Sequence, residues 1–122
     1  TLLASSAASD VYKRQIQYIR RNYPKPITLA MVSNEVSLNY AYFSTMFSKY
    51  TGKTFSEYLR NTRMEKAKEL LRQPDISIAE VAAQVGYENY KSFYRAFKDA
   101  VGTTPVEYQQ KKYRIHREDE KQ

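Results

Sequence analysis

Apolar residues recur at helical spacing through most of the chain. Leu29, Val32 and Val36 fall at positions i, i+3 and i+7, and a second group repeats this spacing after a short gap. The second group consists of Phe43, Met46, Phe47 and Tyr50. The pattern predicts a short amphipathic helix of about nine residues, a turn of three or four, and a second helix of about twelve residues.

The same pattern then occurs a second time. The segment ISIAEVAAQVGYENYKSFYRAFKDAVGTTPVEY, from Ile76, matches ITLAMVSNEVSLNYAYFSTMFSKYTGKTFSEYL, from Ile27, at an offset of 49 residues as far as Val85. From Phe93 onward the offset is 50, so the second turn contains one extra residue. Two copies are too few for a solenoid, and the spacing within each copy is that of a helix-turn-helix.

Residues that cap helices mark the expected boundaries. Ser77 and Glu80 form a capping box, and Pro105 stands at a first helical position, where its missing N–H costs nothing. The other expected N-caps are Thr28, Asn39, Thr54, Asn89 and Thr104. Gly52 and Gly102 are placed to end the second helix of each copy.

Two further segments complete the predicted fold. TFSEYLRNTRMEKAKELLRQ is expected to form one long central helix that ends before Pro74, and a leading helix is expected from about Asp10 to Tyr23, with Ile16 and Ile19 on its apolar face. The fold class is therefore all-α, with seven helices and no strand. The expected organisation is a disordered or artificially joined end over 1–9, a first helix-turn-helix subdomain over 10–53, a linker helix over 54–73, a second subdomain over 74–112 and a polar tail over 113–122.

Composition narrows the chemistry. Twenty Lys and Arg against thirteen Asp and Glu give a net charge of +7, which favours nucleic acid, anionic lipid or an acidic protein as partner. The chain has no Cys, three Gly and one His, His116, which lies in a polar run. These counts argue against thiol or imidazole catalysis, a metal centre and a phosphate-binding glycine loop, and no apolar run is long enough to cross a bilayer. We therefore expect no cofactor, no metal, no enzymatic activity and no membrane partner.

The second helix of a helix-turn-helix enters the major groove of DNA. Once the core positions are removed, its outward face in the first copy offers Tyr40, Ala41, Ser44, Thr45 and Ser48, and in the second copy Tyr90, Lys91, Tyr94, Arg95 and Lys98. Only the second face is cationic, so it alone offers bidentate Arg contacts to guanine. The expected phosphate contacts are Asn39, Tyr40, Ser48, Arg63, Lys68, Ser77, Asn89 and Lys98.

From about Tyr12 to Tyr108 the chain resembles the DNA-binding domain of the AraC/XylS family of bacterial transcription regulators. The resemblance rests on FSTMFSKYTGKTFSEYLRNTRMEKAKELL and on the second copy of the repeat. It implies two helix-turn-helix units joined by a central helix, double-stranded DNA as partner, RNA polymerase as a further candidate partner, and a cytoplasmic location. It also implies base contacts at Ala41, Ser44, Thr45, Tyr90, Lys91, Tyr94 and Arg95. An effector or receiver domain, which family members usually carry, is expected to be missing from this fragment.

Two other interpretations stay open at this point. A basic helical module could bind an acidic protein or RNA, in which case it would show no preference for duplex DNA. Some DNA-repair alkyl acceptors carry a similar domain, but their chemistry needs a thiolate, which this chain lacks. The operator, the signal, and activation versus repression do not follow from the sequence.

Overall fold

The computed structural model describes the backbone of residues 2–35 and 40–111, and the side chains of residues 12–34 and 41–111. The predicted N-cap Asn39, the polar tail over 113–122 and His116 lie outside the described residues, and Tyr40 is described as backbone only. No strand occurs within the described ranges.

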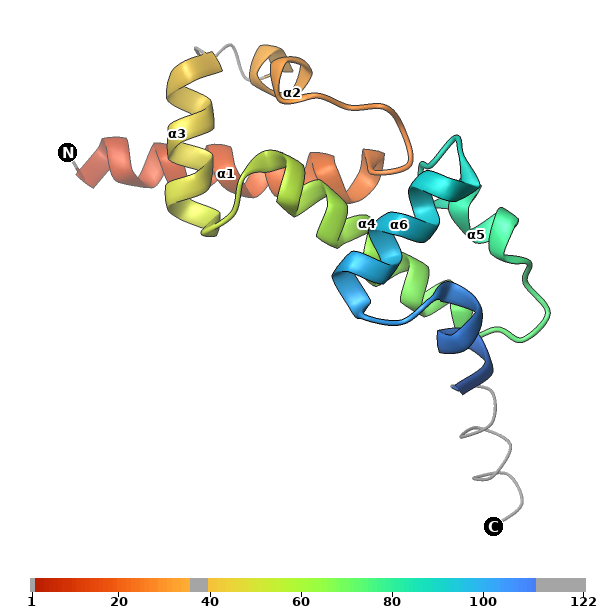
Figure 1. Ribbon diagram of the computed structural model, residues 1–122. Coiled ribbons are helices and arrows are strands. Elements are labelled where there is room, and N and C mark those ends of the chain that lie inside the picture. Colours follow the sequence, from red (N-terminus) through yellow and green to blue (C-terminus); the bar gives the residue numbers. More distant parts are fainter. Residues whose placement is uncertain (1, 36–39, 112–122) are drawn as a thin grey trace. The chain divides into compact units, whose positions relative to one another are not determined.

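The described residues form helices joined by turns and loops (Figure 1). The helices are α1 (Leu2–Asn22), α2 (Leu29–Glu35), α3 (Tyr40–Thr51), α4 (Phe55–Leu71), α5 (Ile78–Gln84) and α6 (Tyr90–Val101), and the chain is helical again over 105–111. The predicted all-α fold with seven helices is confirmed. The chain divides into two compact units, unit 1 (Thr1–Thr62) and unit 2 (Arg63–Gln122), and α4 contributes residues to both.

The helix boundaries repeat as the sequence does. Helices α2 and α5 begin 49 residues apart, and α3 and α6 begin 50 apart, so the extra residue lies between α5 and α6 as predicted. The first helix of each pair has seven residues rather than about nine. In α5 the difference arises because the caps Ser77 and Val85 lie outside the regular helix. The second helix of each pair has twelve residues, as expected.

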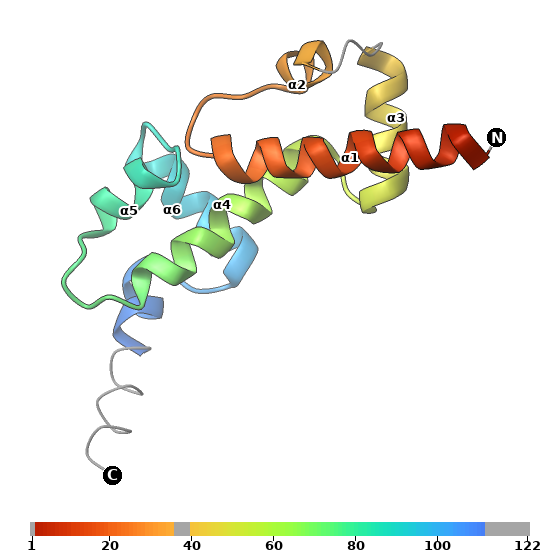
Figure 2. The same ribbon diagram turned by 180° about the vertical axis from the view of Figure 1, so that it is seen from behind.

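Unit 1 is held together by aromatic packing between α1 and α3, which cross in both views (Figures 1 and 2). The Tyr12 ring of α1 stacks on Tyr50 at a centroid distance of 4.3 Å and lies 6.2 Å from Phe43. Phe47, which is fully buried, meets the edge of Tyr58 at 5.6 Å. These contacts fix the rotation of α3 about its axis, and therefore determine which of its side chains face outward.

Two details of unit 1 differ from the sequence prediction. Helix α1 begins at Leu2 instead of near Asp10, because Leu and Ala in the preceding segment favour the helix. On its inner face Ile19 is buried as predicted, whereas Ile16 is only partly buried and Gln15 is 2% exposed.

Unit 2 repeats this architecture around its own core. Val81 of α5 and Phe93 and Phe97 of α6 are fully buried, and the Tyr108 ring meets the edge of Phe97 at 5.6 Å, as Tyr58 meets Phe47 in unit 1. The second half of α4 contributes Met64, Ala67 and Leu71 to the buried residues. In each unit, two phenylalanines that lie one turn apart on the second helix are buried in the core. The opposite side of that helix therefore faces outward.

Hydrogen bonds at helix ends fix the turns of unit 2. Gly102 has φ +92° and donates its N–H to the Lys98 carbonyl oxygen at 2.8 Å, so it is the left-handed cap that ends α6. Pro105 is buried at the start of the next helix, as predicted. From that helix the Gln109 amide donates to the carbonyl oxygens of Gln73 and Ile76, both at 2.9 Å, and so holds the connection between α4 and α5.

Candidate nucleic-acid interface

The N-terminus of α6 is fixed by its cap. The Asn89 Oδ1 accepts hydrogen bonds from the backbone N–H of Lys91 at 2.7 Å and of Ser92 at 3.4 Å. At the start of α5, the Ser77 Oγ accepts from the Glu80 N–H at 3.1 Å. Both predicted caps are confirmed. Because each cap uses an acceptor, the Asn89 amide N–H groups and the Ser77 hydroxyl hydrogen stay available as donors to a phosphate.

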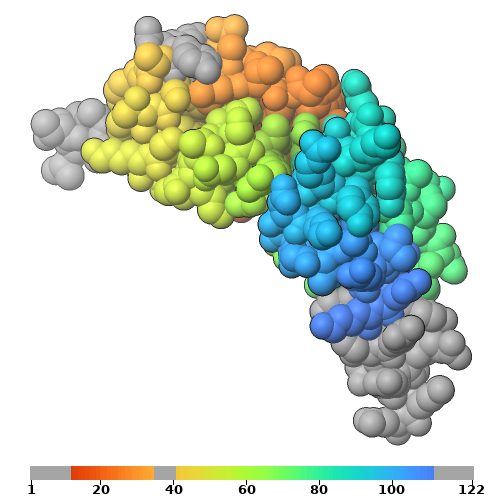
Figure 3. Space-filling model, viewed as in Figure 1, coloured from red at the N-terminus to blue at the C-terminus, as the bar shows by residue number. Residues whose placement is uncertain are grey.

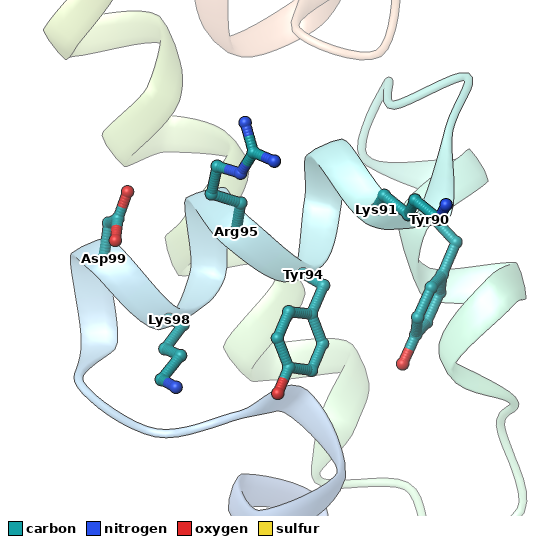
Figure 4. A pocket seen from close by; sticks show the side chains of 6 residues that line it. All are labelled: Tyr90, Lys91, Tyr94, Arg95, Lys98 and Asp99. Atoms are coloured by element: carbon teal, nitrogen blue, oxygen red, sulfur yellow. The ribbon is translucent and has the colours of Figure 1, made fainter.

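The outward face of α6 carries the predicted cationic residues. Phe93 and Phe97 point into the core, and the opposite side is lined by Tyr90, Lys91, Tyr94, Arg95, Lys98 and Asp99 around an open hollow of about 470 Å³ (Figure 4). In the space-filling view α6 forms part of the surface of unit 2 (Figure 3). The structure thus brings the four predicted base-contacting residues of α6 together with Lys98 on one exposed face.

This face has two edges with different chemistry (Figure 4). Tyr90, Tyr94 and Lys98 follow one another at intervals of four residues and point to one side, and the two tyrosine rings are 6.2 Å apart. Arg95 and Asp99, also four residues apart, point to the other side. The tyrosine edge suits apolar contact with a thymine methyl group, whereas a guanidinium suits the two acceptors of guanine.

On the corresponding face of α3, the side chains at the predicted contact positions are small and uncharged. Ala41 and Thr45 are exposed, whereas Ser44 and Ser48 are partly buried. The Thr45 hydroxyl donates to the Ala41 carbonyl oxygen at 3.1 Å, so its methyl group and the two acceptor lone pairs of its oxygen are what it can offer to a base. Asn39 and the side chain of Tyr40 lie outside the described residues.

The two predicted phosphate contacts on α4 are already engaged within unit 2. The Arg63 guanidinium lies over the Tyr87 ring at 5.5 Å, and Lys68 forms an exposed ion pair with Glu65 at 3.1 Å. Burial lowers the pKa of Arg63, while the charge of the Tyr87 phenol and its hydrogen bond raise it. An Arg side chain is effectively always protonated in proteins, so Arg63 keeps its charge. Its contact with Tyr87 gives it a structural role within unit 2.

Sequence reasoning missed one residue of the α6 face. Asp99 lines the hollow beside Arg95, but an acidic residue was not among the side chains expected to meet DNA. Its spacing of four from Arg95 was the available signal, because residues i and i+4 of a helix lie next to each other.

Comparison with known proteins decides the family. A model of the helix-turn-helix domain family matches residues 32–111, which begin within α2 and include α3 to α6. The chain belongs to the AraC family of helix-turn-helix transcription regulators. As an AraC-type domain it is a DNA-binding part of a bacterial regulator, so the resemblance, the fold and the DNA-binding function inferred from the sequence are confirmed.

Several AraC-type relatives match most of the chain. The regulatory protein PocR of Salmonella typhimurium is 34% identical over 98 residues, which are 80% of this chain and 32% of PocR. The C-terminal domain of AraT, a response regulator from Geobacillus stearothermophilus, is 34% identical with a TM-score of 0.80, over 83% of this chain and 84% of that one. The DNA-binding domain of AdpA, solved in complex with a target DNA, shares the fold with a TM-score of 0.74 at 21% identity, over 90% of this chain and 95% of that one.

This AraC-type chain spans only part of its longer relatives. It covers 32% of PocR and 14% of the uncharacterised regulator YtdP of Bacillus subtilis. Within the described part of the chain, no helix has the length and apolarity needed to cross a membrane. The same residues contain no cluster of three or more His, Cys, Asp or Glu placed to hold a metal ion.

Proposed function

We propose that this chain recognises one specific sequence of duplex DNA, with the recognition helices α3 and α6 inserted into successive major grooves. The observation that carries the proposal is the exposed Lys91 and Arg95 edge of α6, which the buried Phe93 and Phe97 hold in a fixed orientation. Arg and Lys pair with the O6 and N7 of guanine, and this pairing is the commonest specific contact in the major groove.

The two helices contribute differently in this proposal. In α6, Tyr90, Lys91, Tyr94 and Arg95 contact bases and Lys98 contacts a phosphate. In α3, Ala41, Ser44 and Thr45 contact bases through methyl and hydroxyl groups, which discriminate between bases less strongly than a bidentate Arg does. The remaining proposed phosphate contacts are Asn39, Tyr40, Ser48, Arg63, Lys68, Ser77 and Asn89.

Several properties of the intact protein belong to the same proposal. We infer that it is not an enzyme and that it acts in the bacterial cytoplasm, where its DNA is. We also infer that an effector or receiver domain lies elsewhere in the full regulator, as the short share of YtdP and PocR that this chain covers suggests. RNA polymerase is the proposed second partner.

Random-site selection on the purified chain, followed by gel-shift titration at fixed salt, tests the proposal. We expect an enriched motif that contains at least one guanine, and tighter binding to it than to a scrambled duplex of the same length. Equal binding to cognate and scrambled duplexes would refute sequence recognition. A preference for RNA or for an acidic protein would favour the basic interaction module considered from the sequence.

A further inference from the structure

Asp99 stands where its charge does not stabilise the helix that carries it. It lies in the last turn of α6, which ends at Val101, and the C-terminus of a helix carries partial negative charge. A carboxylate there is mildly unfavourable for the helix, unlike Lys98 beside it. Asp99 is also exposed and lies outside the core of unit 2. A cationic partner side chain one turn away on α6 would offset this charge.

The nearest such partner along the helix is Arg95. The two residues are one turn apart, both line the hollow and both point to the same side of α6 (Figure 4). The ion pairs found among the described residues are Lys66 with Glu69 and Lys68 with Glu65. In that part of the chain Arg95 and Asp99 form an ion pair neither with another charge nor with each other, so any contact between them forms when α6 meets its ligand.

A second acceptor can hold the side chain of an Arg that reads guanine. The guanidinium has five N–H donors in one plane, and a bidentate contact to guanine uses two of them. A flexible Arg without further support can equally well contact a phosphate, which carries no sequence information. A carboxylate one turn away can accept the remaining N–H groups and keep the guanidinium plane pointed along the groove.

We propose that Asp99 is a positioning residue that holds Arg95 for guanine recognition and, by its negative charge, keeps α6 from binding phosphates in the wrong register. This inference rests on the proposed DNA recognition by α6. Asp99 supports the contact through Arg95 and does not itself touch the base. It raises the specificity of binding while lowering the affinity for unrelated DNA.

The substitution Asp99→Asn tests this role because it removes the charge and keeps the size of the side chain. We expect the ratio of affinities for the selected site and for a site with the Arg95-dependent guanine replaced to fall about tenfold, within the range that one bidentate contact provides. Binding to a scrambled duplex should become tighter. The melting temperature should stay the same or rise, because the unfavourable charge at the helix C-terminus is gone.

Two controls separate positioning from a general charge effect. Asp75→Asn removes an exposed acidic charge of unit 2 outside α6 and should leave the specificity ratio unchanged. In an Arg95→Ala background, Asp99→Asn should no longer change that ratio, because the residue it positions is absent. Asp99→Glu, which keeps the carboxylate, should retain most of the specificity.

The outcomes distinguish this inference from the proposed function. If the unmodified chain selects a site but Asp99→Asn keeps its specificity ratio, or loses it equally in the Arg95→Ala background, the positioning role is wrong and DNA recognition stands. If the unmodified chain shows no preference for any duplex, the proposed function itself fails.

Discussion

At the scale of single residues, the orientation of Arg95 depends on side chains that never meet DNA. Phe93 and Phe97 are fully buried one turn apart, so α6 cannot rotate without moving both rings out of the core. Replacing either one by alanine would cost about 3 to 5 kcal/mol, which is most of the stability of a small domain. The direction in which Arg95 points is therefore a consequence of the core of unit 2.

The first prediction concerns Arg95 itself. Arg95→Ala should weaken binding to the selected site by about 1 to 3 kcal/mol and relax the preference at one base pair, since it removes a bidentate contact. Gel-shift affinities for the site and its single-base variants at fixed salt measure both effects. Lys68→Ala is the control, because Lys68 lies on α4 and should affect all sequences almost equally. An equal loss on every duplex for Arg95→Ala would contradict a base-reading role.

The second prediction concerns the aromatic core of unit 1. Burial raises the pKa of the Tyr12 phenol, and the neighbouring phenols of Tyr42 and Tyr50 raise it further. The folded protein therefore keeps this proton at pH values where the unfolded chain, with a phenol pKa of about 10, loses it. The stability that results is fully present below pH 10 and is lost as the pH rises through the folded pKa.

Urea unfolding of the unmodified chain and of Tyr12→Phe between about pH 8 and 11 measures this effect. Above about pH 10 the free energy of unfolding should fall more steeply for the unmodified chain than for Tyr12→Phe, which has no phenol to ionise at this position. Tyr90→Phe removes a phenol from a ring that is 44% exposed and should follow the unmodified chain. Parallel curves for the unmodified chain and Tyr12→Phe would contradict the argument.

At the scale of elements, helix ends are fixed by local chemistry and could be predicted from the sequence. Ser77, Asn89 and Thr104 cap their helices because a short polar side chain followed by a free backbone N–H is sufficient for a cap. The inner face of α1 was harder to predict. Gln15 is buried there at a position the hydrophobic pattern does not mark, since tertiary packing and not local sequence decides it.

In the candidate site, too, some features could be predicted from the sequence and others could not. The outward position of Lys91 and Arg95 followed from the two buried phenylalanines, so periodicity was enough to predict it. The engagement of Arg63 over Tyr87 joins residues far apart in the sequence, and the bond of the Thr45 hydroxyl to Ala41 depends on a rotamer. Periodicity carries no information about either, and both reduce what those side chains can offer to DNA.

The third prediction concerns the start of α6. Asn89→Ala should lower the free energy of unfolding by about 1 kcal/mol, because the backbone N–H groups of Lys91 and Ser92 lose their acceptor. Urea unfolding measures the loss. Asn89→Asp, which keeps the acceptor and adds a negative charge near the helix N-terminus, should retain the stability but weaken DNA binding, since the added charge faces the phosphates. Unchanged stability of Asn89→Ala would show that the cap contributes little.

At the scale of the whole molecule, the repeat joins two proposed DNA-contacting helices in one chain, which neither unit could do alone. Two second helices with different faces, one small and uncharged and one cationic, are joined by α4, a single helix of 17 residues. A continuous helix cannot lengthen without breaking backbone hydrogen bonds. If both α3 and α6 contact one duplex, the length of α4 should therefore set an upper limit on the distance between their half-sites.

The fourth prediction follows from that constraint. In successive major grooves the two half-sites lie about 34 Å apart, so inserting five base pairs between them moves one half-site to the opposite face of the duplex. Binding should fall to the affinity of the cationic half-site alone, measured with a duplex in which the other half-site is scrambled. Inserting ten base pairs restores the face but doubles the distance, and α4 is too short to follow, so the affinity should stay low. If two chains each bound one half-site, the affinity would instead recover when ten base pairs are inserted. Such a recovery would contradict recognition of both half-sites by one chain. Protection of a single major groove in footprinting would contradict it as well.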